Sequence, residues 1–387
     1  MASWTSASVG YSVYAISIVW LAYTVSHSFL VVGAALFIEL AVYTLSFLAG
    51  PVADRIGNQR TIYVACYPVM AVAAVVIGVA HLDGLLTVPV LLGLIALISV
   101  LWDIAWAAGN AAPGLLLSAD EQFAGQGVSA AVGGVNQIAG YAAGGILILL
   151  VGPGGGMLLY GALLAVAAGL AVPLVIRPNP APGETFGASL RAGWERIWNE
   201  PGRPLLQLAS VDAIAGFYSA MPALLITLLA TSTFRASALA YSGLFVSYVV
   251  GGTIAGLLLG HWNPRSSVGL LLVGSLLGVA AAFGLVIVLP AVLALGVAAF
   301  LAIGFLSSAY LDVKYALFRG RFAPGEQARL ISNMYLFPGI ASSAGALLLG
   351  SLANGVGPAE LAVVAASGFL AAGLLGTVLP AVRSFRF

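Results

Sequence analysis

Long apolar stretches, separated by short polar loops, run through almost the whole chain. A helix needs about 20 apolar residues to cross the hydrocarbon core of a bilayer, and each stretch is close to that length. We therefore expect an all-α membrane protein. The pattern predicts twelve membrane-spanning helices, over residues 9–27, 30–50, 61–80, 86–110, 124–150, 156–176, 205–230, 238–260, 267–288, 291–317, 329–352 and 360–380.

One long polar segment divides these spans into two sets of six. It covers residues 177–204 and opens with a Pro- and Gly-rich sequence that ends a helix. Apolar residues then recur at helical spacing from Phe186 to Trp198, which predicts an amphipathic helix on the membrane surface. We expect a six-helix half at 1–176, this linker, and a second six-helix half at 205–387.

The two halves share short sequence matches in the same order. A Glu-Gln pair precedes the fifth and the eleventh span, and Val-Gly-Pro follows each of these spans at 151–153 and 356–358. Matches at one constant offset indicate a duplication, so we expect pseudo-symmetric halves. Internal repeats are the usual plan of secondary transporters, with the substrate site between them near the bilayer midplane.

Charge and composition narrow the class of protein. The chain is 61% hydrophobic, which leaves too little polar surface for a soluble fold of this size. Of its 14 Lys and Arg residues, all but Arg235 lie on one side of the predicted topology. Basic residues near span ends stay in the cytoplasm, so we expect a multi-pass protein of the cell (inner or plasma) membrane with both termini cytoplasmic. The net charge of +1 argues against nucleic acid as a partner.

Motifs of enzymes and metal sites are absent from the sequence. There is no phosphate-binding loop, and His27, His81 and His261 are too scattered for a metal site. No Ser, His and Asp arrangement suggests a hydrolase. We expect no enzymatic activity, no cofactor and no metal.

The loop between the second and third spans carries the most specific motif. Residues 50–60 read Gly-Pro-Val-Ala-Asp-Arg-Ile-Gly-Asn-Gln-Arg. This resembles the signature loop of the major facilitator superfamily, and Gly260 and Arg265 keep part of the spacing in the second half. With twelve spans and a central linker, the resemblance covers essentially the whole chain. It implies a major-facilitator-like fold, alternating access and a monomer.

In that superfamily the loop is a conformational latch between the halves. The resemblance assigns this role to Gly50, Asp54, Arg55 and Gly57. A glycine allows close helix approach, and an acid can interact with the positive end of a facing helix in one conformation only. Arg60 would anchor the loop in the headgroup layer.

Two acids at matching positions complete the predicted cytoplasmic gate. Asp103 and Asp312 lie nearer the cytoplasmic ends of the fourth and tenth spans. We expect Asp103 to pair with Arg55 or Arg60, and Asp312 with Arg265.

Lys314 is the only lysine in the chain and lies two residues after Asp312. We group it with the gate. It either has a partner inside the membrane or extends its ammonium group to the interface.

A glycine-rich stretch in the fifth span suggests a branch of the superfamily. Gly140, Gly144 and Gly145 resemble part of a motif of drug:proton antiporters, and the Glu-Gln segments look like those of macrolide and enterobactin exporters. The resemblance implies efflux. Tight helix packing by small residues explains the glycines equally well.

Acids inside spans are functional candidates, because a charge there is costly. Glu39 lies 11 residues before Gly50, roughly 16 Å deep at 1.5 Å per residue. It either binds a coupling proton or is a protonated side chain hydrogen-bonded between helices. Asp212, about two turns into the seventh span, either faces the cavity or bonds at the span mouth. The expected substrate contacts are Trp20, Asn136, Gln137 and Tyr218.

Together these features predict a secondary active transporter. The leading hypothesis is proton-coupled efflux of a small amphipathic or hydrophobic compound by antiport, with protons or another ion and the lipid bilayer as further partners. One alternative is an importer or uniporter of a polar metabolite or ion. Another is a non-transporting membrane sensor or assembly module.

Overall fold

The structure is a computed structural model. It describes residues 2–46, 56, 58–116, 119–174, 191, 194–195, 197–199, 203–235, 237–261, 268–288, 292–321 and 324–385. Within these residues the regular structure is entirely helical. The chain divides into two compact units, Met1–Gly183 and Glu184–Phe387, and the division falls inside the segment that the sequence predicts as a linker.

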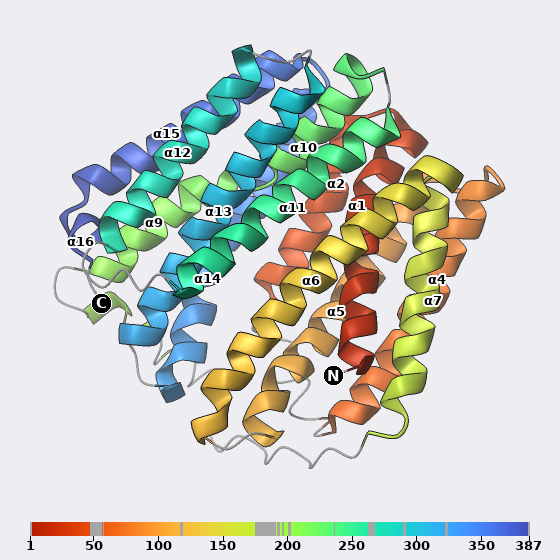
Figure 1. Ribbon diagram of the computed structural model, residues 1–387, viewed down its shortest axis with the longest axis horizontal. Coiled ribbons are helices and arrows are strands. Elements are labelled where there is room, and N and C mark those ends of the chain that lie inside the picture. Colours follow the sequence, from red (N-terminus) through yellow and green to blue (C-terminus); the bar gives the residue numbers. More distant parts are fainter. Residues whose placement is uncertain are drawn as a thin grey trace. The chain divides into compact units, whose positions relative to one another are not determined.

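The N-terminal unit contains six long helices, coloured red to yellow-green in Figure 1. Their bounds are α1 Ala2–Ser26, α2 Phe29–Thr44, α4 Gln59–Leu82, α5 Val88–Leu116, α6 Ala119–Val151 and α7 Pro153–Ala171.

The C-terminal unit contains the remaining spans and a short terminal helix. Their bounds are α9 Pro204–Phe217, α10 Met221–Leu228, the π-helical turn η1 Leu229–Thr233, α11 Ala238–His261, α12 Val268–Val288, α13 Leu293–Arg321, α14 Pro324–Ala353, α15 Pro358–Val378 and α16 Pro380–Arg383.

The predicted spans agree with these helices. In the described part of the chain, eleven helices are long and apolar enough to cross a membrane, counting α9, α10 and η1 as one. The twelfth is α2, whose predicted span 30–50 continues into residues outside the described part. The prediction of an all-α membrane protein with twelve spans is confirmed.

The seventh span is broken, whereas the sequence predicts a continuous helix over 205–230. Helix α9 ends at Phe217, a short turn follows, and α10 begins at Met221 with Pro222 in its first turn. Proline has no N–H group, and its ring clashes with the carbonyl four residues earlier, so a helix is interrupted just before it.

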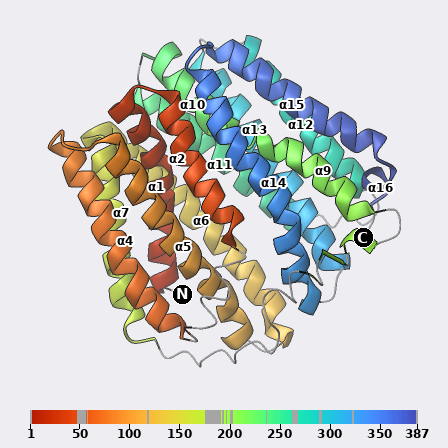
Figure 2. The ribbon, with the colours of Figure 1, turned by 180° about the vertical axis from the view of Figure 1, so that it is seen from behind.

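The same helix pairings occur in both units. In the N-terminal unit α1 packs on α6 and α7, α4 packs on α5 and α7, and α2 packs on α5. In the C-terminal unit α9 packs on α14 and α15, α12 packs on α13 and α15, and α11 packs on α13. Figures 1 and 2 show two of these equivalent pairs, α4 beside α7 and α12 beside α15. Each of these five pairings has its counterpart in the other unit, so the six-helix halves are pseudo-symmetric.

Glycines allow α6 to lie directly on α1. A Cβ atom added to Gly140 would lie 2.5 Å from the Cβ of Ser12 and from the carbonyl oxygen of Val9. One added to Gly144 would lie 2.7 Å from Ile16. Such distances are far shorter than van der Waals contact, so no larger residue fits without moving α6 away from α1.

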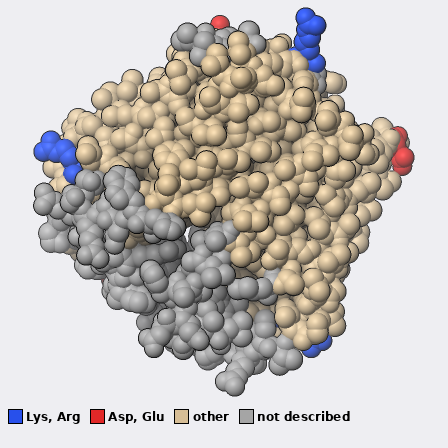
Figure 3. All heavy atoms as spheres, in the orientation of Figure 1, with Lys and Arg blue, Asp and Glu red and all other residues tan. Residues whose placement is uncertain are grey.

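Large apolar side chains cover much of the outer surface. Leu85, Leu150, Leu270 and Val378 are each at least 70% exposed. On the face shown in Figure 3, the charged side chains lie at the margin of a broad uncharged area. A surface this apolar is unfavourable in water and matches a lipid environment.

Candidate functional site

A buried ion pair joins two helices of the C-terminal unit. The Nζ of Lys314 on α13 lies 3.1 Å from Oδ1 and 3.2 Å from Oδ2 of Asp212 on α9. Both side chains are only 4% exposed. The hydroxyl of Tyr310 also donates a hydrogen bond to Asp212. The carboxylate is therefore held by one cation and one hydroxyl donor.

Aromatic rings surround the ammonium group of Lys314. Its Nζ lies 5.5 Å from the ring centroid of Tyr310 and 5.2 Å from that of Tyr335 on α14. Both separations are within the range of cation–π attraction. The hydroxyls of Tyr315 and Tyr335 share a hydrogen bond that links α13 to α14. Three helices thus converge on one lysine.

Helical periodicity explains why this cluster forms. Tyr310 and Lys314 are four residues apart, so they lie on the same face of α13. Lys314 and Asp312 are two residues apart and cannot face each other. The carboxylate of Asp312 lies instead near Gly256 of α11. The sequence grouped Lys314 with its chain neighbour Asp312, whereas the structure places it on Asp212 of another helix.

The ion pair lies within the apolar spans, nearer their ends than their middles. Asp212 is eight residues after the start of the span Pro204–Thr233, and Lys314 is four residues before the end of the span Leu293–Phe318, which is roughly 12 Å and 6 Å from those ends. Charges at such depth are costly unless they are paired, and removing one partner of a buried pair costs about 3–5 kcal/mol.

The N-terminal unit contains a half-buried acid, Glu39 on α2, besides the buried Asp103 on α5. Its Oε1 atom is buried and has no hydrogen-bond partner in the described structure. The hydroxyl of Tyr14 on α1 lies beside the carboxyl but makes no regular hydrogen bond. Tyr11 and Tyr160 are also close enough for electrostatic interaction with Glu39. This acid has tyrosines around it, whereas Asp212 has a basic partner.

Stacked aromatic rings connect α1 and α5 in the same unit. Tyr11 stacks on Trp102 with ring centroids 4.2 Å apart, and Trp4 stacks on the same indole at 6.1 Å. Asp103, next to Trp102 on α5, is 7% exposed. In this half aromatic stacking joins the two helices that correspond to α9 and α13.

Most of the predicted latch lies outside the described residues. This holds for Gly50, Asp54, Arg55, Gly57 and Arg265.

Besides Lys314, the structure describes three of the predicted gate residues, Arg60, Asp103 and Asp312. Arg60 is exposed at the start of α4, and Asp312 is half-buried on α13. Among the residues that the structure describes, Asp103 forms no ion pair with Arg60. The gate pairings stay predictions.

The predicted substrate contacts are divided between the two units, and their role stays a prediction. Asn136 is 4% exposed, whereas the adjacent Gln137 is exposed on another face of α6. Trp20 is buried on α1 near Tyr23. Tyr218, at the break after α9, packs near Phe369 of α15.

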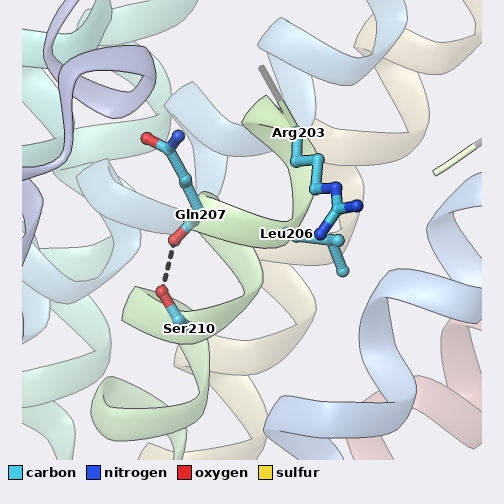
Figure 4. A pocket seen from close by; sticks show the side chains of 4 residues that line it. All are labelled: Arg203, Leu206, Gln207 and Ser210. Carbon is cyan, nitrogen blue, oxygen red and sulfur yellow. Dashed lines mark hydrogen bonds between the residues drawn. The ribbon is translucent and has the colours of Figure 1, made fainter. Parts of the chain in front are cut away.

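A pocket of about 490 Å³ opens beside the first turns of α9. Figure 4 shows its lining residues, Arg203, Leu206, Gln207 and Ser210. Its polar side chains are engaged, because Gln207 accepts a hydrogen bond from the N–H of Ala381 and Ser210 donates to the carbonyl of Gln207. None of the predicted site residues lines it, so we take the buried acids and Lys314 as the candidate site.

Sequence reasoning missed the tyrosines around Lys314. The signal that could have found Tyr310 is its position one turn before the only lysine of the chain. Tyr335 lies on another helix, and nothing in the sequence pattern places it beside Lys314.

The fold is that of a major-facilitator-like membrane protein, with two pseudo-symmetric halves and charged groups buried inside each half. No family model and no curated protein sequence matches the chain. Solved structures do match it over nearly its whole length. A nucleoside transporter, NupG, has a TM-score of 0.72 at 12% identity and covers 98% of this chain and 100% of its own.

Two further structures are similar to the same extent. A bacterial homologue of the human lysosomal transporter Spinster has a TM-score of 0.70 at 14% identity, over 100% of this chain and 96% of its own. A POT family transporter in complex with 5-aminolevulinic acid has a TM-score of 0.76 at 11% identity, over 97% and 94%. At such low identity the similarity establishes the fold, and function has to be argued from the site.

Proposed function

We propose that the protein is a proton-coupled secondary transporter of a small organic molecule and works by alternating access. Of the proteins of similar fold, one is named a nucleoside transporter, one a homologue of a lysosomal transporter, and one a POT family transporter in complex with 5-aminolevulinic acid. Two repeated halves with polar sites in their interiors suit a carrier that reorients around a bound substrate.

The observation that carries the proton coupling is the carboxyl of Glu39, which has no ionic partner among the described residues. One of its oxygens is buried without a hydrogen-bond partner in the described structure. A carboxyl in such a place is tolerated when it holds a proton, and it releases that proton only in a conformation that admits water. Its protonation therefore favours one conformation over the other, which is all that coupling requires.

The direction of transport is a separate part of the proposal. The glycine motif of the fifth span favours efflux of an amphipathic or hydrophobic compound. The buried pair of Asp212 and Lys314 favours the second candidate, uptake of a polar compound, because a purely hydrophobic substrate needs no buried ion pair.

Several sequence predictions belong to the same proposal. The latch around Asp54, the cytoplasmic termini, the cell membrane location and the monomeric state are all consistent with a carrier of this kind. A non-transporting sensor would have no need of a titratable acid without an ionic partner inside a span.

Purified protein in proteoliposomes with an imposed pH gradient provides the test. Internal pH is followed while carboxylates, lipophilic cations and neutral metabolites are added to wild type, Glu39→Gln and Glu360→Gln. Glu360 is an exposed acid at the start of α15 and is the matched control. We expect substrate-dependent proton movement in wild type and in the control.

Glu39→Gln cannot release a proton at this site. We expect it to lose net transport and proton movement but to keep exchange of labelled substrate across the membrane. Net transport without proton movement in wild type, or proton movement unchanged in Glu39→Gln, contradicts the role proposed for Glu39.

A further inference from the structure

We infer that Lys314 is the recognition group for the carboxylate of a monoanionic substrate, and that Asp212 occupies this place in the empty protein. The inference rests on the proposed transport function and adds the chemical class of the substrate. It is carried by the geometry of the buried pair and by the aromatic rings around the ammonium group.

Asp212 is a template for the ligand. Both of its carboxylate oxygens lie within 3.2 Å of the ammonium nitrogen. A substrate carboxylate that replaces it meets an ammonium group already placed within reach of both carboxylate oxygens. The rings of Tyr310 and Tyr335, with centroids 5.5 and 5.2 Å from Nζ, provide apolar surface for the part of the substrate next to its carboxylate.

The rings of Tyr310 and Tyr335 contact the ammonium group of Lys314 independently of Asp212. Their centroids lie 5.5 and 5.2 Å from Nζ, within the range of cation–π attraction. These contacts leave Lys314 available to bind an anion in place of Asp212.

Charge balance requires a proton to bind along with the substrate. The empty site holds one positive and one negative charge, so it is neutral. A carboxylate added to this pair would leave a net negative charge in an apolar interior, which is costly. The site stays neutral if one proton from solution binds to a carboxylate oxygen of Asp212 as the substrate carboxylate takes its place on Lys314.

The same balance excludes other classes of ligand. A phosphate monoester carries about two negative charges near neutral pH, and one lysine with one titratable acid cannot compensate both. A neutral molecule cannot displace Asp212 from the ammonium group. The site therefore favours monocarboxylates with an apolar body.

No other described charge competes at this site. Around Asp212 the titratable side chains are Lys314 and Tyr310, with Tyr335 reached through the lysine. On the other helices packed against α9, Glu360 of α15 and Arg383 of α16 are exposed. The proton uptake linked to binding is therefore assigned to Asp212.

A purely structural ion pair is the competing explanation. Helix α9 packs mainly on α14 and α15, and α13 mainly on α11 and α12. The pair could thus act only as a connection between helices that otherwise have different neighbours. The double variant Asp212→Asn/Lys314→Gln separates the two explanations, because it removes the charges together and leaves no unpaired charge.

The experiment measures binding to purified full-length protein in lipid nanodiscs, by calorimetry and by the shift of the unfolding temperature. The probes are acetate, butyrate, benzoate and phenylacetate. Phenylacetamide, phenethylamine and phenyl phosphate are the neutral, cationic and dianionic counterparts. The proteins are wild type, Lys314→Gln, Asp212→Asn, the double variant and Glu39→Gln.

We expect at least one of the carboxylates to bind wild type, and the three counterparts not to bind. Its affinity should fall about tenfold for each unit that the pH rises while Asp212 is ionised in the empty protein, because one proton is taken up per ligand. Lys314→Gln and the double variant should lose binding, whereas Glu39→Gln should keep it. Asp212→Asn should bind without this pH dependence and be stabilised by the same carboxylate.

The inference is overturned if none of the four carboxylates binds wild type, if phenylacetamide binds as well as phenylacetate, or if the folded double variant still binds. Should Asp212→Asn fail to fold, the double variant and Lys314→Gln decide the question. Failure of the proposed function is distinct. It shows as an absence of substrate-dependent net transport by wild type in vesicles, although a carboxylate binds to Lys314.

Discussion

Neutralising one member of the buried pair should destabilise the protein strongly. At 3.1 Å between Nζ and Oδ1, the attraction between Lys314 and Asp212 is about 5 kcal/mol with an effective dielectric constant of about 20. The cost of burying both charges offsets much of this attraction in the intact protein. A single neutralisation removes the attraction and leaves the other charge buried, at a cost of about 3–5 kcal/mol.

A double-mutant cycle measures this interaction directly. Lys314→Gln and Asp212→Asn are each compared with the double variant, by reversible unfolding in mixed micelles. We expect each single variant to lose about 3–5 kcal/mol. The double variant should lose much less than the sum of the two single variants, because it leaves no uncompensated charge.

The surface pair of Arg191 and Glu195 provides the matched control. Its atoms are 2.8 Å apart, closer than those of the buried pair, but the side chains are 82% and 58% exposed. Exposed pairs contribute about 0–1 kcal/mol, so Glu195→Gln should have almost no effect. Additive losses in the Asp212 and Lys314 cycle, or a loss below about 1 kcal/mol in either single variant, would refute the assignment of a buried ionic interaction.

Three further predictions concern packing, the latch and the tyrosine hydroxyl. In thermal unfolding, Gly140→Leu should destabilise the protein by about 3 kcal/mol or more, because the new side chain would overlap Ser12. The control is Gly133→Ala on the same helix. Its added methyl group meets nothing within 4 Å, so this variant should be neutral or slightly stabilising. Asp54→Asn should slow net transport at least tenfold without weakening substrate binding, because the latch affects the change between conformations and not the substrate site. Transport at the wild-type rate would contradict the role of the latch. Tyr310→Phe should lower the free energy of unfolding by about 1–3 kcal/mol, since it removes a hydrogen bond to a charged group. Tyr23→Phe is the control variant, and an equally small effect of both substitutions would contradict this prediction.

The spans could be predicted from sequence because membrane-spanning helices have a strong one-dimensional signal. Apolar length alone identified the helices, and the repeated Glu-Gln and Val-Gly-Pro segments indicated two related halves. The break after Phe217 was missed even though Pro222 is visible in the sequence. Proline is tolerated inside membrane helices when neighbours satisfy the freed groups, as Pro68 within α4 shows, so its presence does not decide between a kink and a break.

The partners of buried charges could not be predicted in the same way. Asp212 and Lys314 are about a hundred residues apart, and their contact depends on how α9 and α13 lie in the fold. Chain proximity suggested Asp312 instead, although two residues in a helix point in different directions. Glu39 was identified by its depth alone, but the tyrosines around it come from other helices.

The two halves differ in the side chains that connect equivalent helices. Equivalent helix pairs pack together in both units, yet the contact between α1 and α5 is a stack of Tyr11 on Trp102, whereas that between α9 and α13 is an ion pair. A duplication preserves packing because helix spacing depends on small residues such as Gly140 and its counterpart Gly345, which meets Phe217 of α9. The polar groups are free to diverge, and they have done so in a complementary way.

Among the described residues, one half holds an acid, Glu39, with no ionic partner, and the other holds a lysine whose partner, Asp212, is proposed to leave it. We expect such an acid to respond to protons, since no described basic residue pairs with it. A paired lysine responds to anions, because only an anion can take the place of its partner. We therefore expect Glu39→Gln to change coupling without changing carboxylate affinity, and Lys314→Gln to abolish affinity. If Glu39→Gln weakens carboxylate binding in nanodiscs as much as Lys314→Gln does, proton coupling and anion binding are not assigned to separate halves.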